Sequence, residues 1–197
     1  MKRLFDFTMS FVGLIVLCPI IAVAWVAAAI STRSHGLFVQ HRVGKHGKRF
    51  AVIKLRSMRN FPGASATTVT TRDDCRITPV GSLLRRLKLD ELPQLINVLF
   101  GQMSLVGPRP DVLGFADQLT GSNRIVLSVL PGITGPASLK FRDEEQMLAD
   151  ASDPEKFNRD VIWPEKVRLN CEYVRNYLFR TDLRYIFQTI FKTERHA

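Results

Sequence analysis

An uncharged apolar run near the N-terminus restricts the fold more than any other feature of this sequence. It extends from Phe11 to Ile30, and an α-helix of that length is ~30 Å long, the thickness of the hydrocarbon core of a bilayer. A secretory signal peptide is disfavoured, because the run is long, no small-residue cleavage site follows it, and the next charged residues are basic. The sequence therefore predicts a helix embedded in a membrane.

The residues around and within the run leave two topologies open. Lys2 and Arg3 precede it, and five Lys or Arg residues lie between positions 33 and 49, so the positive-inside rule places both ends in the cytoplasm. Pro19, in the middle, removes a backbone donor and predicts a bend. Together these features fit a re-entrant helical hairpin that enters one leaflet and returns. A kinked spanning helix is the alternative that composition alone favours, since spanning helices tolerate proline.

The positive charge of the chain is concentrated around this segment. The 197 residues include 28 Lys and Arg and 18 Asp and Glu, for a formal net charge of +10. Residues 1–60 contain ten of the basic residues and one acid, Asp6, so they carry +9 and leave +1 for residues 61–197. A nucleic-acid binder carries its basic patch on the folded domain, whereas this distribution predicts contact with an anionic membrane surface.

Several classes of site find no support in the sequence. The three Cys and four His residues lack metal-ligand spacing, which argues against a zinc site, and a disulfide framework is not expected. Neither GxGxxG nor GxxxxGKS/T occurs, so two common nucleotide-binding loops are excluded. Hydrophobic residues make up 46% of the chain, which is enough for the core of one compact domain.

The remainder of the chain predicts a series of short elements. These are extended segments at 37–43 and 50–58, a turn at 44–47, an exposed loop at 60–79, and helices that begin at 81 and 94. The second of these helices is expected to stop at Gly101. Residues 182–191 carry one apolar helical stripe, which either packs on the core or lies on a membrane.

Asp90 and Glu91 form the most informative pair of residues, just before Pro93. Acids before a helix-initiating proline usually cap the helix, and this is the first interpretation. The second is functional, because a helix N-terminus stabilises a carboxylate and the basic residues at 85, 86 and 88 can hold a diphosphate. In that setting an ionised carboxylate can bind a metal or attack phosphorus.

Two rigid loops follow. In Gly107-Pro108-Arg109-Pro110, prolines on both sides fix the backbone around one guanidinium, which suits bidentate contact with a phosphate. Residues 131–136, PGITGP, form a second loop that either lets a ligand approach the backbone or only turns the chain.

These clusters together resemble one family, the bacterial sugar transferases, which are monotopic phosphoglycosyl transferases. The resemblance rests above all on RRLKLDELPQLINVLFGQMSLVGPRP (85–110), where DELPQ and GPRP occur together. The apolar helix with its central proline also matches, and so do FVQHRVG (38–44), VIKLRSM (52–58), RITPVGSLLR (76–85) and PGITGPAS (131–138). The resemblance covers essentially residues 1–140, and the C-terminal end of the chain matches the family more loosely.

The resemblance implies a reaction and an architecture. A sugar 1-phosphate moves from a UDP-sugar to undecaprenyl phosphate, UMP is released, a covalent sugar-phosphate intermediate forms on an Asp, and Mg²⁺ is the expected cofactor. The expected fold is a mixed α/β, mostly helical catalytic domain (37–197) with amphipathic interfacial helices. A re-entrant anchor (1–36) is expected to hold it on the cytoplasmic face of a bacterial inner membrane, where assembly of a surface glycan begins.

The resemblance also assigns roles to residues. Asp90 corresponds to the nucleophile, Glu91 to the second acid of the pair and Lys54 to a further catalytic residue, and the two acids are the candidate metal ligands. The residues expected to bind the substrate are Arg85, Pro108, Arg109, Pro110 and Arg142.

Three positions depart from the family pattern. Cys18 stands before Pro19 where Ser is usual, and a thiol is a weaker donor to a broken helix backbone. Leu130 replaces a basic residue, and ASLKFRD (137–143) leaves Arg142 as the candidate for the family's Arg in that stretch. The sequence therefore does not identify the sugar that is transferred.

The alternative function is a non-catalytic basic module that is membrane-anchored and recruits nucleic acid or a partner protein.

Overall fold

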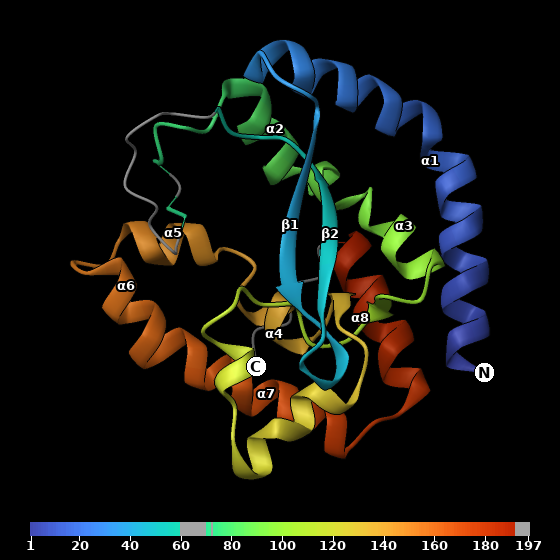
Figure 1. Cartoon of the computed structure of the whole chain (residues 1–197), viewed down its shortest axis with the longest axis vertical. Coiled ribbons are helices and arrows are strands. Elements are labelled where there is room, and N and C mark those ends of the chain that lie inside the picture. The colour runs from blue at the N-terminus through green and yellow to red at the C-terminus, as the bar shows by residue number, and fades with distance from the viewer. Residues whose placement is uncertain (60–69, 72, 192–197) are drawn as a thin grey trace.

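The computed structural model describes residues 1–59, 70–71 and 73–191 of the chain. The described part forms one compact body of one long helix and several shorter ones around two small sheets (Figure 1). Its helices are α1 (Lys2–Thr32), α2 (Pro79–Arg86), α3 (Gln94–Leu99), α4 (Pro136–Lys140), α5 (Glu144–Ala149), α6 (Pro154–Phe157), α7 (Trp163–Arg175) and α8 (Phe179–Phe191). Its strands are β1 (Leu37–Val43), β2 (Arg49–Leu55), β3 (Ser104–Val106) and β4 (Gly132–Thr134). The expected class, mixed α/β and mostly helical, is confirmed.

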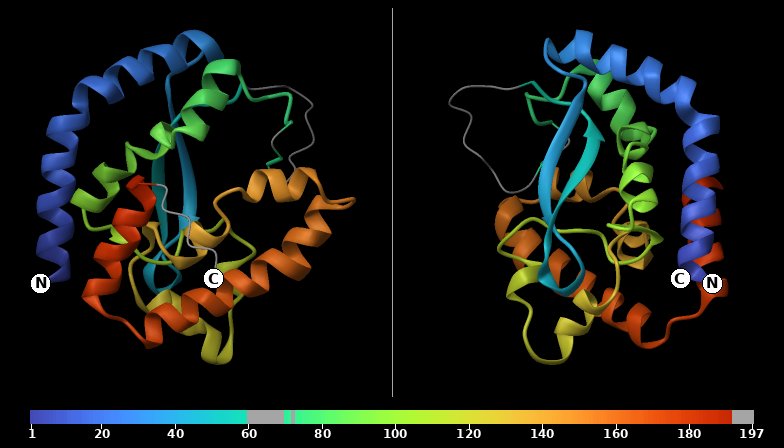
Figure 2. Two further views of the ribbon diagram at one scale, coloured as in Figure 1. Left: turned by 180° about the vertical axis from the view of Figure 1, so that it is seen from behind. Right: turned by 45° about the vertical axis from the view of Figure 1, so that its right-hand side comes forward.

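Helix α1 contains the apolar run and bends near its middle, as Figures 1 and 2 show. Its only proline is Pro19, which accounts for the bend because a proline inside a helix breaks a backbone hydrogen bond. Among the described helices, α1 is the one long and apolar enough to cross a membrane. Most of its side chains are exposed, and only a few small or polar ones pack inward. In its second half Ala24 and Ala28 pack against Leu55 and Leu84.

The first turns of α1 are joined to the folded domain by polar contacts. The Asp6 carboxylate accepts hydrogen bonds from the Ser104 hydroxyl (2.8 Å) and the Leu105 amide (3.2 Å). The Arg3 guanidinium donates to the carbonyls of Val98 (2.6 Å) and Leu99 (2.8 Å), where a cation satisfies the open end of α3. The division into an anchor (1–36) and a catalytic domain (37–197) therefore stays a prediction.

Strands β1 and β2 pair antiparallel, with Leu37 opposite Leu55 and Val43 opposite Arg49. The predicted turn between them is confirmed, and Gly47 adopts the left-handed conformation there (φ 75°). The second strand ends at Leu55, earlier than predicted. Beyond it the Ser57 carbonyl accepts from Thr78 N (3.1 Å), so the chain turns toward the start of α2. Most of the loop predicted at 60–79 lies outside the described residues.

Strands β3 and β4 form a parallel pair that carries the two rigid loops. The strands approach so closely that a Cβ on Gly132 would lie 2.1 Å from Gly107 N. Any larger residue at 132 would push the pair apart. The GPRP loop and the PGITGP loop are consequently neighbours, although the sequence alone did not place them together.

The C-terminal half wraps around the lower part of the hairpin, with α7 and α8 running back past the sheets (Figures 1 and 2). Helix α8 was predicted over 182–191 and extends over Phe179–Phe191. Its predicted apolar stripe faces outward, with Phe187 55% and Ile190 66% exposed. The helix packs instead through Asp182 and Thr189. This arrangement favours the interfacial interpretation of the stripe over a core-facing one.

Candidate functional site

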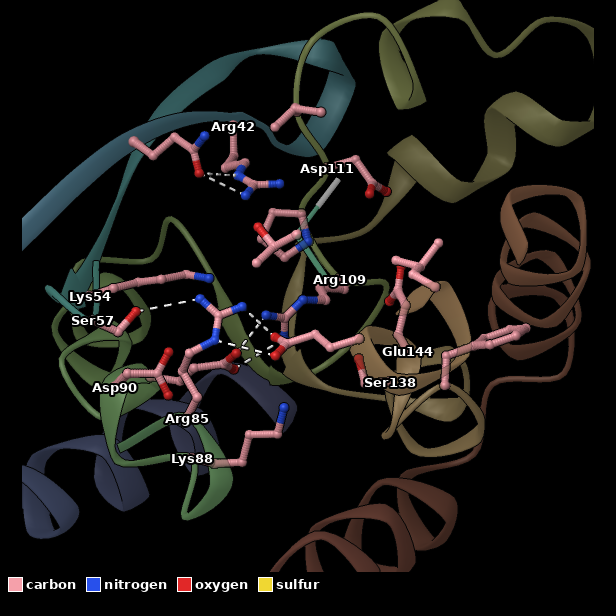
Figure 3. A pocket seen from close by; sticks show the side chains of 18 of the residues that line it. Arg42, Lys54, Ser57, Arg85, Lys88, Asp90, Arg109, Asp111, Ser138 and Glu144 are labelled. Carbon is pink, nitrogen blue, oxygen red and sulfur yellow. Dashed lines mark hydrogen bonds and ion pairs between the residues drawn. The ribbon is translucent and has the colours of Figure 1, made fainter. Parts of the chain in front are cut away.

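A cleft of about 480 Å³ opens between the β1–β2 hairpin, the turn after α2, the GPRP loop and helices α5 and α7 (Figure 3). Its wall contains seven of the eight residues predicted to bind substrate or catalyse: Lys54, Arg85, Asp90, Glu91, Arg109, Pro110 and Arg142. The eighth, Pro108, is buried in the loop beneath Arg109. The structure thus brings together residues from positions 54 to 142.

A short 3-10 turn (η2, Leu89–Glu91) presents the two acids. It follows directly on α2, and Lys88 adopts a left-handed conformation (φ 56°) that reverses the chain between the two helices. Both acidic residues are 8% exposed. Helix α3 has no side-chain cap, so the interpretation of these acids as ordinary helix caps is wrong. Their carboxylates belong to the cleft instead.

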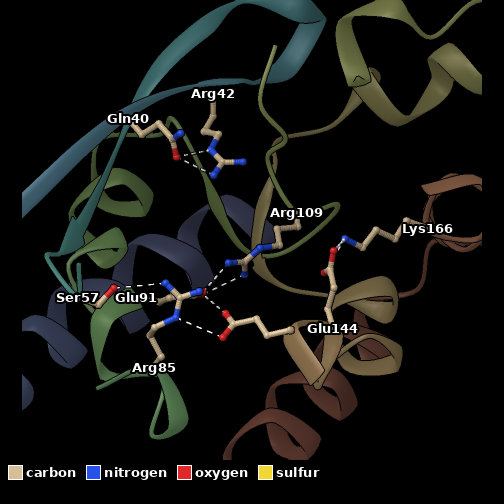
Figure 4. A network of polar contacts seen from close by, with 9 residues as sticks. Gln40, Arg42, Ser57, Arg85, Glu91, Arg109, Glu144 and Lys166 are labelled. Atoms are coloured by element: carbon tan, nitrogen blue, oxygen red, sulfur yellow. Dashed lines mark hydrogen bonds and ion pairs between the residues drawn. The ribbon is translucent and has the colours of Figure 1, made fainter. Parts of the chain in front are cut away.

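Glu91 is paired with Arg109. The guanidinium donates to Glu91 Oε2 (3.0 Å) and Oε1 (2.5 Å), a bidentate pair that fixes both side chains (Figure 4). Burial opposes the ionisation of Glu91, but Arg109 and Lys54 outweigh it and hold the pKa of this carboxyl well below its usual range. Glu91 is therefore a carboxylate at every physiological pH.

Asp90 differs from its neighbour. Its Oδ1 is buried and accepts no hydrogen bond from the described residues. Burial, followed by the charge of Glu91, raises the pKa of Asp90, while Lys54 and Arg85 oppose that rise. A carboxylate with an unsatisfied oxygen among cations is suited to bind a cation or to attack an electrophile. The two adjacent acids therefore have opposite pKa directions, because Arg109 stabilises the charge of Glu91.

Cations surround the two acids. The Lys54 ammonium lies within the cleft, where burial and the charge of Arg109 lower its pKa to about 8. Arg85 forms an ion pair with Glu145 of α5, and its Nη1 lies 3.4 Å from the Ser57 hydroxyl (Figure 4). Lys88 also lines the cleft. This concentration of positive charge suits a ligand with more than one phosphate.

Backbone hydrogen bonds hold Arg109 in place. Gly132 N donates to the Pro108 carbonyl (2.8 Å), Gly107 N donates to the Thr134 carbonyl (2.9 Å), and Val43 N donates to the Asp111 carbonyl (2.9 Å). The GPRP loop is therefore fixed on one side by β4 and on the other by β1. This confirms the expected rigid backbone around the guanidinium.

The remaining predicted residues lie further out. Arg142 lines the cleft but donates to the Thr189 carbonyl of α8 (3.1 Å). Cys18 and Pro19 are exposed on α1. In the described part of the chain the Cys18 thiol makes no hydrogen bond. It therefore does not donate to the helix backbone broken by Pro19, as the serine usual at this position could.

Sequence reasoning missed a second group of polar residues in the same cleft. Arg42 donates to Gln40 Oε1 through Nε (3.0 Å) and Nη2 (2.7 Å), and Lys166 pairs with Glu144 (2.7 Å), as Figure 4 shows. Asp111 lies between them, where burial raises its pKa to about 6. Its place directly after GPRP was the one sequence signal that could have identified it. The others come from distant segments and have no local signature.

The acids in the cleft also fit a divalent cation. In the described residues no cluster of three or more His, Cys, Asp or Glu exists, so protein ligands alone do not build a closed site. Mg²⁺ commonly binds to one or two carboxylates and completes its shell with substrate phosphates and water. The unsatisfied Asp90 Oδ1 fits that pattern, and Glu91 would be the second carboxylate ligand.

A buried carboxylate with an unsatisfied oxygen, a cleft lined by cations and an exposed apolar helix together suit an enzyme that meets a charged substrate at a membrane. The model for bacterial sugar transferases matches residues 1–196. The chain belongs to this family, as its sequence motifs predicted. Membership in a transferase family argues against the alternative of a non-catalytic binding module.

Individual relatives support the same assignment. The chain is 39% identical over 197 residues to a UDP-glucose:undecaprenyl-phosphate glucose-1-phosphate transferase of Klebsiella pneumoniae, covering 97% of this chain and 39% of that protein. It is 34% identical to an undecaprenyl-phosphate galactose phosphotransferase of Salmonella typhimurium, covering 96% and 39%. It is 36% identical to the exopolysaccharide production protein PSS of Rhizobium leguminosarum, covering 96% and 93%. The chain thus spans about two fifths of the first two relatives and nearly all of the third.

Proposed function

We propose that this chain transfers a sugar 1-phosphate from a UDP-sugar to undecaprenyl phosphate and releases UMP. The observation that carries the proposal is the buried Asp90 carboxylate, with one oxygen unsatisfied, inside a cleft of phosphate-binding cations. The names of the relatives from Klebsiella and Salmonella support both the lipid acceptor and the sugar phosphate. Which sugar is transferred is left open, since these two relatives differ in it.

In the first displacement, a carboxylate oxygen of Asp90 attacks the phosphorus that bears the sugar. A bond forms between that oxygen and phosphorus, and the bond from phosphorus to the bridging oxygen breaks. UMP leaves with the electron pair, and the sugar phosphate stays on Asp90 as an acyl phosphate. Arg109 and Lys54 neutralise the charge that gathers on the phosphate oxygens.

In the second displacement, a phosphate oxygen of undecaprenyl phosphate attacks the same phosphorus. The Asp90 carboxylate leaves, and a diphosphate-linked sugar lipid forms. Glu91 stays ionised, and its paired contact holds the Arg109 guanidinium in the cleft. Bound Mg²⁺, held by Asp90 and Glu91, would supply further charge neutralisation at the diphosphate.

The membrane segment places this chemistry next to the acceptor. We propose that α1 enters and leaves the cytoplasmic leaflet of a bacterial inner membrane, so that the cleft faces the soluble donor while the lipid phosphate arrives from the bilayer. The bend in α1 and the exposed apolar stripe of α8 support this orientation.

Asp90→Asn tests the proposal. The amide keeps the shape of the side chain but is a far weaker nucleophile, so UMP release from a panel of UDP-sugars with undecaprenyl phosphate should fall by about 10³-fold or more. Wild-type protein incubated with the donor alone should gain the mass of one sugar phosphate on the peptide that contains Asp90.

Asp150→Asn is the matched control, since Asp150 is exposed at the end of α5 and lies outside the cleft. It should keep wild-type turnover. Transfer that persists in Asp90→Asn, or an adduct on another residue, would refute the role of Asp90. Absence of turnover with every UDP-sugar in folded wild-type protein would refute the reaction itself.

A further inference from the structure

The cleft continues past Arg109 into a region that the two displacements leave unused. Five of the side chains that line it are Asp111 of the loop after β3, Ser138 of α4, and Trp163, Lys166 and Asn170 of α7. We call these five residues the α7 lobe. In Figure 3, Asp111 and Ser138 lie on the far side of Arg109 from Asp90.

The α7 lobe contains buried polar atoms without partners. Asn170 is 5% exposed, and neither its Oδ1 nor the Ser138 hydroxyl makes a hydrogen bond within the described residues. The Asp111 carboxylate forms no ion pair or hydrogen bond there either, although its backbone is fixed to Val43. Buried polar groups in folded proteins nearly always have hydrogen-bond partners, so a ligand that supplies the missing partners would satisfy these atoms.

An aromatic wall adjoins these polar atoms. Trp163 packs edge-to-face against Phe115, with ring centroids 5.3 Å apart, and both rings line the cleft. A flat apolar surface next to hydrogen-bonding groups suits a planar ring that has a polar edge.

The direction of the first displacement indicates which part of the donor would reach the α7 lobe. The leaving oxygen lies opposite the attacking oxygen in a phosphoryl transfer, so UMP extends away from Asp90. In Figure 3 the Arg109 side chain stands between Asp90 on one side and Asp111 and Ser138 on the other. It therefore lies between the nucleophile and the α7 lobe, and the lobe is on the side of the leaving group.

We propose that the α7 lobe is the nucleoside subsite and holds the uridine of the donor. This inference rests on the proposed function, because it takes Asp90 as the attacking group. Asp111 accepts hydrogen bonds from the ribose hydroxyls, as acidic residues do in other nucleotide sites. The Asn170 amide, which offers a donor and an acceptor side by side, pairs with the imide edge of uracil.

Binding of UMP to the full chain in detergent, measured by calorimetry, tests the ribose contact. Asp111→Asn should weaken UMP about tenfold, the value of one charge-assisted hydrogen bond. The same variant should bind 2′,3′-dideoxyuridine monophosphate as the wild type does, because that nucleotide lacks the hydroxyls. Asp160→Asn is the matched control, since Asp160 is exposed and outside the cleft, and it should not change either affinity.

Asn170→Leu tests the base contact independently. It should weaken UMP about tenfold and leave the affinity for ribose 5-phosphate unchanged. If both variants bind UMP normally but change the KM values among different UDP-sugars, the lobe holds the sugar and the inference is wrong. Equal weakening of UMP and the dideoxy nucleotide by Asp111→Asn would likewise overturn the ribose contact. These measurements need no acceptor and no turnover, so failure of the transfer reaction is a separate result.

Discussion

Lys54 is a residue of the cleft whose charge changes just above neutral pH. Burial of its ammonium and the nearby charge of Arg109 lower its pKa from 10.5 to about 8. The positive charge of the cleft therefore decreases as pH rises through 8. The arginines keep their charge over the same range.

We expect kcat/KM for the UDP-sugar to fall as pH rises above about 8, because the free enzyme loses the Lys54 charge that attracts the diphosphate. Lys54→Arg keeps its charge and should show no decline over that range. A pH profile of UMP release between pH 6.5 and 9.5 measures the difference. Identical alkaline limbs in the two proteins would show that another group titrates.

Loss of the Lys54 proton has the opposite effect on the free energy of unfolding. The pKa of Lys54 is lower in the folded protein than in the unfolded chain, so the unfolded state binds more protons between pH 8 and 10.5. The contribution of Lys54 to the free energy of unfolding therefore rises over that range while activity falls. An alkaline loss of activity caused by unfolding would instead show both quantities falling together.

At the scale of elements, α1 is both bent and mostly exposed, and Pro19 lies in it. A straight helix of this length is long enough to cross a bilayer. A bent helix fits both a re-entrant hairpin and a kinked span, so labelling of its two ends is the measurement that distinguishes the two topologies.

We expect both ends of α1 to face the cytoplasm. In a chain whose native cysteines are replaced, single cysteines at Leu4 and Ser34 should resist an impermeant maleimide added from the periplasmic side and react in inverted vesicles. Pro19→Ala should straighten the helix and expose one of the two positions to periplasmic label. Labelling of one end in the Pro19 protein would establish a spanning helix and contradict the re-entrant topology.

At the scale of the whole molecule, Asp182 connects the two ends of the described chain. It is 2% exposed and accepts hydrogen bonds from Tyr173 (2.7 Å) and Tyr177 (3.3 Å). It also forms an ion pair with Lys2, at the start of α1. Phe5 packs edge-to-face on Phe179 beside this cluster, with ring centroids 5.3 Å apart. The membrane helix is thus attached to α8.

Asp182→Ala should lower the free energy of unfolding by roughly 2–3 kcal/mol, because it removes the buried carboxylate that pairs with the Lys2 ammonium and the Tyr173 hydroxyl. Each of these two donors then retains the neutral Val106 carbonyl as an acceptor. Thermal unfolding in detergent measures the loss, and limited proteolysis should cut near the start of α1 sooner. Glu172→Ala, which removes an exposed ion pair on α7, should change stability by less than about 1 kcal/mol. An unchanged melting temperature in Asp182→Ala would mean that the cluster does not stabilise the attachment.

Local signals predicted much of the fold and part of the site. The β1–β2 hairpin followed from two extended segments around a glycine-containing turn. Helix α3 ends at Leu99, two residues before the predicted stop at Gly101, where the left-handed backbone (φ 78°) favours glycine. The functional importance of Asp90 was predicted from its motif. The outward face of α8 was not decided, since an apolar stripe has the same pattern whether it meets a core or a membrane.

The sequence by itself determined the apolar helix with its proline, the pair of acids and the two rigid loops, because each depends on residues close together in the chain. Only the tertiary structure paired Arg109 with Glu91, 18 positions away, and so gave the two adjacent acids opposite pKa shifts. It also brought Asp111 and Asn170 into one cleft. Such contacts depend on how separate elements pack, and burial and charge at a site arise only after that packing has excluded water.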